Sequence, residues 1–432
     1  MLCPLVFLLG LAPPPPVDPP PPSPPSPSIH LQDLLQEARR KNPEIVAARE
    51  QTRADEAAAS GAGALDDPML MVQLWNMPVD LSTVPLMVNV TQPIPLGGKR
   101  AARRDEATAT TEMSRAAAMA RSRDVENQIA RAYFDLFLAD RTIEVDAEIG
   151  LNLQTLVAAA SSRVGAGRGE EAEVLRAESE ALKVQSDREA AIGRRAAATA
   201  KLVALLDRPP GSEIGRTAEP GLLAQLPQAE ELRARALHDR PERSMAGAAA
   251  RAAEARQRLA HAEAVPDISA SAGEMHMFGG SSQPADFLFL GVQANLPIFS
   301  GKNRARVGEA EARVAVAHAE TRAMENRILA EVADALAELQ AETRQAQLHH
   351  KLIPLARQAL SSALASYAAG RGSFAMVLDT ERDLQMHALD LAAHLAGYSQ
   401  RLADLERAVG GDVGLVRASE AGVHASHEEV SQ

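Results

Sequence analysis

The segment PLGGKR at residues 95–100 recurs, with two inserted residues, as PIFSGKNR at residues 297–304. The tripeptide GRG at residues 167–169 returns at residues 370–372, and its spacing of 203 residues equals that of Lys99 and Lys302. Two copies of a pattern in register are the signature of an internal repeat. The chain is therefore a tandem duplication, with a first repeat at residues 30–215 and a second repeat at residues 216–410.

Each repeat contains one helix that is too long for an ordinary globular core. Residues 100–162 contain no proline, and as one helix they would reach roughly 95 Å. The leading helix at residues 31–65 and the returning helix at residues 168–208 sum to about the same length. We therefore expect the two shorter helices to stack end to end beside the long one.

The second repeat follows the same plan. Its long helix is expected at residues 304–367 and its returning helix at residues 373–409. Gly150 and Pro354 interrupt the two long helices near matching places. Glycine and proline are the residues at which helices bend or lose hydrogen bonds, so we expect a kink or local unwinding at both positions.

Short stretches with a period of two separate the helices. In LMVNVT at residues 86–91 apolar residues alternate with more polar ones, and FLFLGVQANL at residues 287–296 does the same. This alternation predicts half-polar strands, which pair as hairpins with the preceding segments at residues 69–77 and 267–277. Four strands cannot close a membrane barrel, whereas three copies would supply twelve strands around an aqueous bore. A small soluble β-sandwich is the alternative.

Composition excludes several classes of protein. A net charge of -12 leaves no basic stripe for nucleic acid. One Trp, three Tyr and eight Phe in 432 residues are few for a large aromatic core and typical of Ala-rich helices. No run of 18 apolar residues occurs beyond the extreme N-terminus, which argues against a polytopic helical membrane protein.

The two ends of the chain differ from the repeats. Residues 1–12 form a short apolar segment that is similar to the hydrophobic part of a secretory signal, although no positive charge precedes it. Residues 13–29 are a Pro-rich linker, and residues 411–432 are expected to be a disordered tail. Cys3 is the single cysteine, so no intramolecular disulfide can form.

The order helix, hairpin, long helix, turn and returning helix, given twice, together with PLGGKR at residues 95–100, resembles the TolC-like outer membrane efflux protein family. The resemblance covers about residues 30–410. It implies an α+β membrane fold: long antiparallel helices that form a periplasmic α-barrel, and two β-hairpins that contribute to a trimeric transmembrane β-barrel. It also implies a passive outer-membrane export channel that docks to a periplasmic adaptor protein and, through it, to an inner-membrane pump. The segments Asp66-Asp67-Pro68 and Asn76-Met77-Pro78 are similar to the branch that serves heavy-metal efflux.

The resemblance also points to residues at the turns between the long and returning helices. Adaptor-docking tips are implied at Arg163, Gly165, Gly167, Tyr367 and Gly370. The acid that the family tends to place after each tip is matched by Glu173 in the first repeat, and in the second repeat Asp379 stands near that place. Three copies of these acids could form a constriction in the bore that favours cations. Capping of a helix N-terminus is the simpler explanation for Glu173.

Chemical motifs are otherwise scarce. The sequence contains no nucleophile elbow, phosphate loop, zinc-protease helix or paired cysteines, so we expect neither an enzyme nor a cofactor. The run Glu274-Met275-His276-Met277 offers soft metal ligands, but alternate strand residues point to opposite faces. His349 and His350 are adjacent on a helix and cannot chelate together without another element, so we interpret them as surface residues. A periplasmic adaptor or a coiled-coil scaffold is the alternative function for a chain of this kind.

Overall fold

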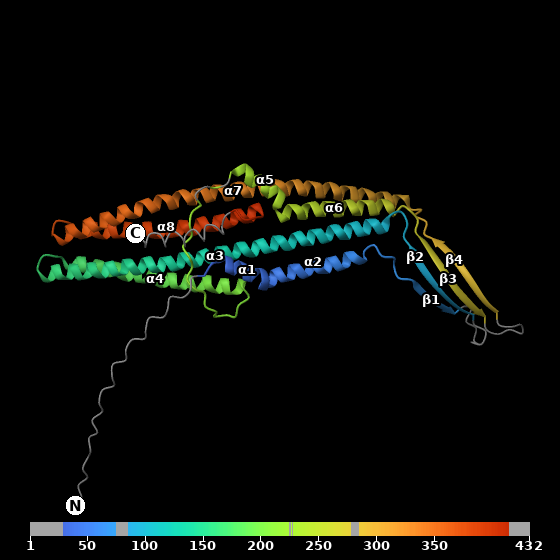
Figure 1. Cartoon of the computed structure of the whole chain (residues 1–432), viewed down its shortest axis with the longest axis horizontal. Helices are drawn as coiled ribbons and strands as arrows, with labels where there is room; N and C mark the ends of the chain where they lie inside the picture. The colour runs from blue at the N-terminus through green and yellow to red at the C-terminus, as the bar shows by residue number, and fades with distance from the viewer. Residues whose placement is uncertain (1–28, 75–84, 224–225, 227, 278–284, 414–432) are drawn as a thin grey trace, which may run out of the picture.

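The computed structural model describes residues 29–74, 85–223, 226, 228–277 and 285–413. The signal-like segment, nearly all of the Pro-rich linker and most of the expected tail lie outside these residues, as does the Asn76-Met77-Pro78 segment. Within the described part of the chain there are eight helices and four strands. Figure 1 shows a long helical body with the strands at one end and the two helical turns at the other.

Both repeats have the same order of elements. The first consists of α1 (Leu31–Lys41), α2 (Pro43–Gly61), β1 (Met69–Leu74), β2 (Leu86–Ile94), α3 (Lys99–Gly165) and α4 (Glu171–Leu205). The second consists of α5 (Ala229–Asp239), α6 (Pro241–Ala262), β3 (Ile268–Met277), β4 (Ala285–Ala294), α7 (Ser300–Ala368) and α8 (Phe374–Val409). The predicted duplication, the hairpins and the long helices are confirmed.

The long helices are continuous. Helix α3 has 67 residues and α7 has 69, so each spans about 100 Å. The predicted unwinding at Gly150 and Pro354 is wrong, because both residues lie inside unbroken helices. A helical glycine costs only about 1 kcal/mol. Pro354 costs more, but apolar residues on both sides of it, Ile353 and Leu360 among them, pack in the cluster at the tip end, and this packing opposes that cost.

The shorter helices stack end to end, as predicted, and one side chain makes the junction in the first repeat. Helices α4 and α2 follow each other alongside α3 (Figure 1). The Asn42 side chain caps α2 by accepting hydrogen bonds from the N–H groups of Glu44 and Ile45, at 2.9 and 3.3 Å. Its amide also donates to the carbonyl of Leu205 at the end of α4, at 2.8 Å. Pro209, four residues later, has no N–H to offer that carbonyl.

The second repeat makes the same junction with different chemistry. The buried guanidinium of Arg240 donates to the carbonyl of Ala408 near the end of α8, at 3.5 Å. It also forms ion pairs with Glu242, at 3.0 Å, and with Glu331, at 2.5 Å. A residue at the break between two short helices thus binds the end of the returning helix in both repeats.

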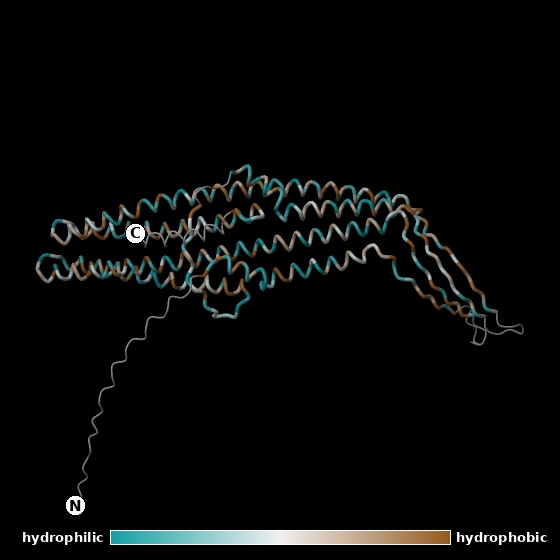
Figure 2. The backbone as a smooth tube through the Cα atoms, viewed as in Figure 1, coloured by the Kyte–Doolittle hydropathy of each residue, from teal (hydrophilic) through white to brown (hydrophobic). Residues whose placement is uncertain are grey.

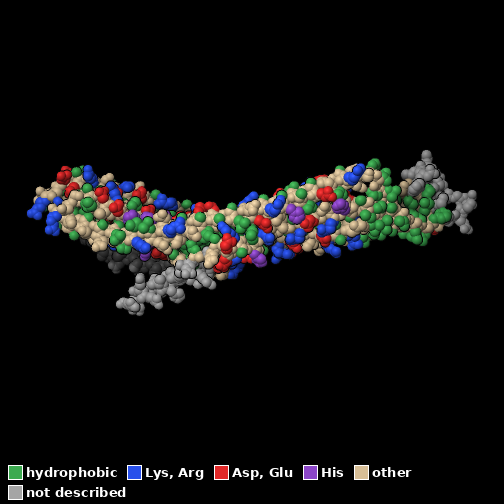
Figure 3. Space-filling model, turned by 90° about the horizontal axis from the view of Figure 1, so that it is seen from above, with side chains coloured by type: hydrophobic (Ala, Val, Ile, Leu, Met, Phe, Trp, Pro, Cys, Tyr) green, Lys and Arg blue, Asp and Glu red, His purple; other side chains and the backbone are tan. Residues whose placement is uncertain are grey.

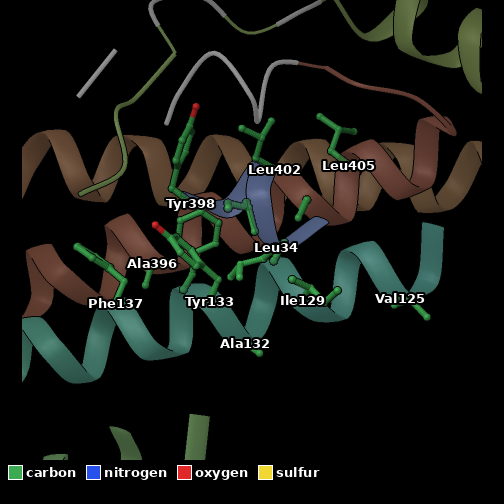
Figure 4. Close-up of a cluster of buried hydrophobic side chains, with 14 of the residues drawn as sticks. Leu34, Val125, Ile129, Ala132, Tyr133, Phe137, Ala396, Tyr398, Leu402 and Leu405 are labelled. Carbon is green, nitrogen blue, oxygen red and sulfur yellow. The ribbon is translucent and has the colours of Figure 1, made fainter. Parts of the chain in front are cut away.

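The main core lies in the middle of the body, where α1, α3, α7 and α8 meet, and Figure 4 shows part of it. Tyr133 and Tyr398 are buried there. The Tyr133 hydroxyl donates to the carbonyl of Ile29 and accepts from the N–H of Ala218, while the Tyr398 hydroxyl accepts from the N–H of Leu223. These bonds fasten the connection between the repeats to the helices. A second cluster fills the tip end, and a small third cluster of Ala250, Ala253 and Ala317 packs α6 against α7.

The four strands form one antiparallel sheet in the order β1-β2-β3-β4. The central pairing of β2 with β3 joins the two repeats. No helix in the described residues is long and apolar enough to span a bilayer.

Candidate functional site

One face of the sheet is more apolar than the other, although it also carries Glu274, His276 and Asp286 near one end. The registers place Leu70, Val90, Ala272 and Leu290 in one row across all four strands. The same face carries Leu74, Val72, Leu86, Val88, Ile94, Ile268, Ala270, Leu288 and Val292. Leu288, Leu290 and Val292 are about four-fifths exposed, at 81%, 82% and 80%. Exposed apolar patches of this kind mark a surface that contacts lipid or another protein, and Figure 2 shows the hydrophobic colouring along the strands.

The opposite face is mixed and more polar. The row next to Leu290 contains Met69, Thr91, Ser271 and Gly291. Asn89, Ser269 and Gln293 also lie on this face. Strands that are apolar on one face and polar on the other, about ten residues long, are typical of transmembrane barrels. The outer strands β1 and β4 each present one edge that pairs with no other described strand.

The PLGGKR motif fixes the sheet to the helical body. Gly97 adopts a left-handed φ of +71°, and a Cβ there would lie 2.8 Å from Val265, so the turn from β2 into α3 requires glycine. The buried Lys99 ammonium donates to the Asp267 carboxylate at 2.6 Å and to the Val265 carbonyl at 2.8 Å. Because Asp267 directly precedes β3, this ion pair ties the first repeat to the second at the base of the sheet.

The far end of the body brings together tip residues from both repeats. Arg163 donates to the carbonyl of Tyr367 at 2.6 Å, and its guanidinium carbon lies 4.3 Å from the centre of the Tyr367 ring. The Tyr367 hydroxyl donates to the Glu173 carboxylate at 2.9 Å. Burial, and then the neighbouring Glu173, raise the pKa of Tyr367 to about 12, so this hydroxyl remains a donor at neutral pH.

The glycines of the tips have distinct roles. Gly167 and Gly370 adopt left-handed φ values of +68° and +72° and end the two hairpin turns. Gly165 is the last residue of α3 and is helical. Glu173 lies in the first turn of α4, as its capping interpretation requires. Asp379 does not join it: its side chain is 69% exposed, and the nearest cation is Arg382 at 3.9 Å.

A ladder of polar contacts behind the tips also links the repeats, and the sequence analysis missed it. Arg382 on α8 donates to both carboxylate oxygens of Glu180 on α4, at 3.1 and 2.7 Å. This guanidinium holds the pKa of Glu180 below its usual range. Deeper in the body, Glu381 accepts from Asn152 at 3.1 Å and Asp146 accepts from Gln385 at 3.0 Å. None of these residues stands in a recognisable motif, and only the packing of α3, α4 and α8 brings them together.

The candidate metal ligands of the sequence are arranged as follows. Glu274 and His276 lie on the apolar face of the sheet and Met275 on the other, so the run does not gather around one ion. His276 contacts Asp286 across β3 and β4. The interpretation of His349 as a surface residue is wrong: its side chain is only 13% exposed and lies between α7 and α8, whereas His350 is exposed.

The chain is similar to known proteins both in sequence pattern and in structure. A family model described as outer membrane efflux protein matches residues 34–208 and 232–411. The structure is similar to the outer-membrane channel OprN, with a TM-score of 0.76 and 19% identity over 88% of this chain and 90% of that one. It is similar to CusC, at 0.76 and 22% over 88% and 92%, and to VceC from Vibrio cholerae, at 0.75 and 22% over 89% and 96%. No curated protein matches in sequence.

These likenesses agree with the geometry of the sheet and of the tips. The adaptor and scaffold alternative would leave a four-stranded sheet with one exposed apolar face and open edges unexplained. Since the family model matches well over half of the residues, the chain belongs to the outer membrane efflux protein family.

Proposed function

We propose that three copies of this chain form one passive duct through the outer membrane, which exports solutes and catalyses no reaction. The observation that carries the proposal is the four-stranded sheet with one exposed apolar face and an open edge on both β1 and β4. In lipid every backbone N–H and C=O needs a partner, so an open sheet cannot remain there. Pairing of β4 in one copy with β1 in the next removes the open edges.

The number of copies follows from the size of the bore. Two copies would give eight strands, a barrel whose interior side chains fill, whereas three give twelve strands and leave room for water. The strands β2, β3 and β4 have 9, 10 and 10 residues, which matches the 9–11 tilted residues needed to cross the hydrocarbon. The face with Leu290 would contact lipid and the face with Ser271 would line the bore.

The helical body would continue the duct into the periplasm. Its length of about 100 Å, with charged side chains distributed along it and apolar ones gathered at the sheet end in Figure 3, suits an aqueous extension from a membrane anchor. We propose that the tips, with Arg163, Gly165, Gly167, Tyr367 and Gly370, dock to a periplasmic adaptor protein that connects the duct to an inner-membrane pump. Glu173 and Asp379 would face the narrow end of the bore and favour cations.

Single-channel recording of the detergent-purified oligomer, with its mass measured in parallel, tests the duct. Two variants at nearly the same depth of the sheet sharpen the test. Arginine at a lipid-facing midplane position costs about 2–4 kcal/mol per copy, so Leu290→Arg should abolish insertion. Ser271→Arg, on the other face, should insert and reduce cation preference. A soluble, non-conducting wild type, or equal insertion of both variants, would contradict the assignment.

The cargo is a finer proposal. The Asp66-Asp67-Pro68 and Asn76-Met77-Pro78 segments support heavy-metal cations as the exported class. Deletion of the gene in its native host should then increase sensitivity to Co²⁺, Zn²⁺, Cd²⁺ or Cu⁺ more than sensitivity to organic toxins. An increase confined to organic toxins would refute heavy-metal export and leave the duct intact.

A further inference from the structure

The one group of metal-ligating side chains in the described residues lies between α7 and α8. It consists of His349 on α7 and of His387 and Asp390 on α8, and one donor atom from each lies within 4.8 Å of the others. His387 and Asp390 are three residues apart and therefore share one face of their helix. His349 Nδ1 lies 3.9 Å from an Asp390 carboxylate oxygen, and the His349 and His387 ring centres are 5.4 Å apart.

The donor atoms are buried and unused. Nδ1 of His349 and Nδ1 of His387 are inaccessible to water and have no hydrogen-bond partner among the described residues. Buried polar atoms without partners are rare, and a site for a bound ion is one of the few physical explanations. Burial, with the neighbouring histidines adding to it, lowers the pKa of His349 despite the opposing effect of Asp390.

A third histidine completes the surroundings. His394 lies one helical turn beyond Asp390, and its ring centre is 5.3 Å from that of His349. Its Nδ1 is hydrogen bonded to the Glu342 carboxylate at 2.7 Å, which leaves Nε2 as the other ring donor atom. A carboxylate that orients a histidine through one nitrogen while the other binds metal is a recurring arrangement around zinc.

The first repeat shows that the fold does not need this layer. At the spacing of 203 residues that relates the two tips, Glu342 and His349 correspond to Ala139 and Asp146. His387, Asp390 and His394 correspond to Val184, Asp187 and Ala191. Ala139, Val184 and Ala191 are buried and pack the equivalent layer without any histidine. Three of the eleven histidines of the chain thus gather at one place where the duplicate has Asp146, Val184 and Ala191 instead.

We propose that His349, His387 and Asp390 bind a divalent transition-metal ion between α7 and α8, with His394 as a fourth ligand or as a neighbour that orients the site. Two or three imidazoles and a carboxylate suit Zn²⁺, Co²⁺, Ni²⁺ or Cu²⁺ better than Mg²⁺ or Ca²⁺. Donors in a tetrahedral zinc site are about 3.3 Å apart, given bonds of 2.0–2.1 Å. Since the donor atoms lie within 4.8 Å of one another, they need to approach by up to about 1.5 Å, a movement within reach of side-chain rotation. The site needs only one chain, and so does not depend on the proposed trimer.

Titration of the full-length protein, purified in detergent without a histidine tag, tests the site with Zn²⁺ by calorimetry and with Co²⁺ by visible absorption. We expect one ion per chain and the ligand-field bands of four-coordinate Co²⁺. His387→Val installs the residue of the first repeat, and His387→Gln keeps a polar side chain of similar size. Both should weaken binding at least about tenfold, since even loss of an outer-shell partner costs roughly 10–100-fold.

The matched control is His318→Ala, because His318 on α7 lies 3.3 Å from Glu254 and outside the group. It should leave stoichiometry and affinity unchanged. Zn²⁺ should also slow hydrogen exchange in residues 342–353 and 384–395 of the wild type and not of the His387 variants. An absence of binding up to about 100 μM Zn²⁺, or binding that is equal in wild type and in both folded His387 variants, would overturn the proposal.

Discussion

Replacement of Asn42 by alanine should loosen the joint between α4 and α2 without unfolding the body. Asn42 is buried, with only 3% of its surface exposed. Its oxygen accepts from the first turn of α2, and its amide donates to the Leu205 carbonyl. Alanine removes both functions at once, and no backbone N–H can take over at Leu205, because Pro209 occupies the position four residues on.

The size of the effect follows from the two functions of Asn42, the cap of α2 and the hydrogen bond to the Leu205 carbonyl. Loss of an Asn N-cap to alanine costs about 1 kcal/mol. Loss of the donor to a part-buried carbonyl adds about 1 kcal/mol. We therefore expect about 2 kcal/mol of local destabilisation, which is roughly a 30-fold increase in the opening equilibrium. Asn42→Ser separates the parts, since serine caps a helix as well as asparagine but is too short to reach Leu205. It should give about 1 kcal/mol, or roughly fivefold.

Hydrogen exchange measured by mass spectrometry on the purified protein reads these values directly. Peptides that cover residues 43–50 and 200–208 should exchange faster in the order wild type, Asn42→Ser, Asn42→Ala. Peptides at the tips, such as residues 360–370, should not change, because they lie at the far end of the body. Equal exchange in all three proteins at residues 43–50 would refute the claim that Asn42 holds the joint, and equal effects of Ser and Ala would refute the capping part.

Three further predictions concern the tips and the ladder behind them. Tyr367→Phe keeps a ring over Arg163 but loses the hydrogen bond to Glu173, so tryptic cleavage at the tips should accelerate severalfold. Tyr367→Leu loses both contacts and should accelerate cleavage further. Equal cleavage rates for the two variants would exclude a stabilising cation–π contact. Arg382 lowers the pKa of Glu180 from 4.5, so their ion pair stabilises the fold above about pH 4.5 and is lost as the pH falls through the lower pKa of the folded state. Glu180→Gln should therefore lower the free energy of unfolding by about 1 kcal/mol at pH 7 and approach wild type only in acid. An equal loss of stability at all pH values would contradict this. Burial raises the pKa of Glu381, so its ionised form destabilises the fold. Glu381→Gln should therefore be more stable than wild type at pH 7, and this gain should vanish below pH 4.5. Thermal melts at several pH values check both expectations.

The architecture could be predicted from the sequence because repeated motifs and long uninterrupted stretches indicate it. Two copies of a Gly-Lys motif, prolines at element boundaries and uninterrupted Ala-rich stretches determine the order and length of the helices. Alternation in residues 86–91 and 287–296 located the strands, although their ends moved by a few residues. Unwinding at Gly150 and Pro354 was wrong, because local propensity cannot include the packing of α3 and α7 against their neighbours.

The contacts between repeats were beyond prediction for a physical reason. The partners Glu180 and Arg382 are 202 residues apart, and neither stands in a motif. Arg163, Tyr367 and Glu173 were singled out one by one, but only the structure brings them into one cluster. His349 was wrongly predicted to lie on the surface, because the sequence of one helix does not show which of its faces another helix will cover. Its neighbour His350 lies on a different face and is exposed. His349 and His387 lie on different helices and far apart in the sequence, so the group of possible metal ligands could not be predicted either.

Comparison of the repeats separates what the fold requires from what it permits. Asn42 and Arg240 differ in size and charge, yet each sits at a helix break and binds the last turn of the returning helix. The fold therefore demands a donor at this joint and accepts more than one side chain to provide it. The layer of His349 is a different case, because its counterpart keeps Asp146 and Asp187 but has no histidine, and small apolar side chains replace Glu342, His387 and His394. Imidazoles that the duplicate replaces with an aspartate and small apolar side chains are not what the helical hairpin needs for packing. Its buried imidazole nitrogens carry a desolvation cost, which a bound metal ion would offset and a purely structural role would not.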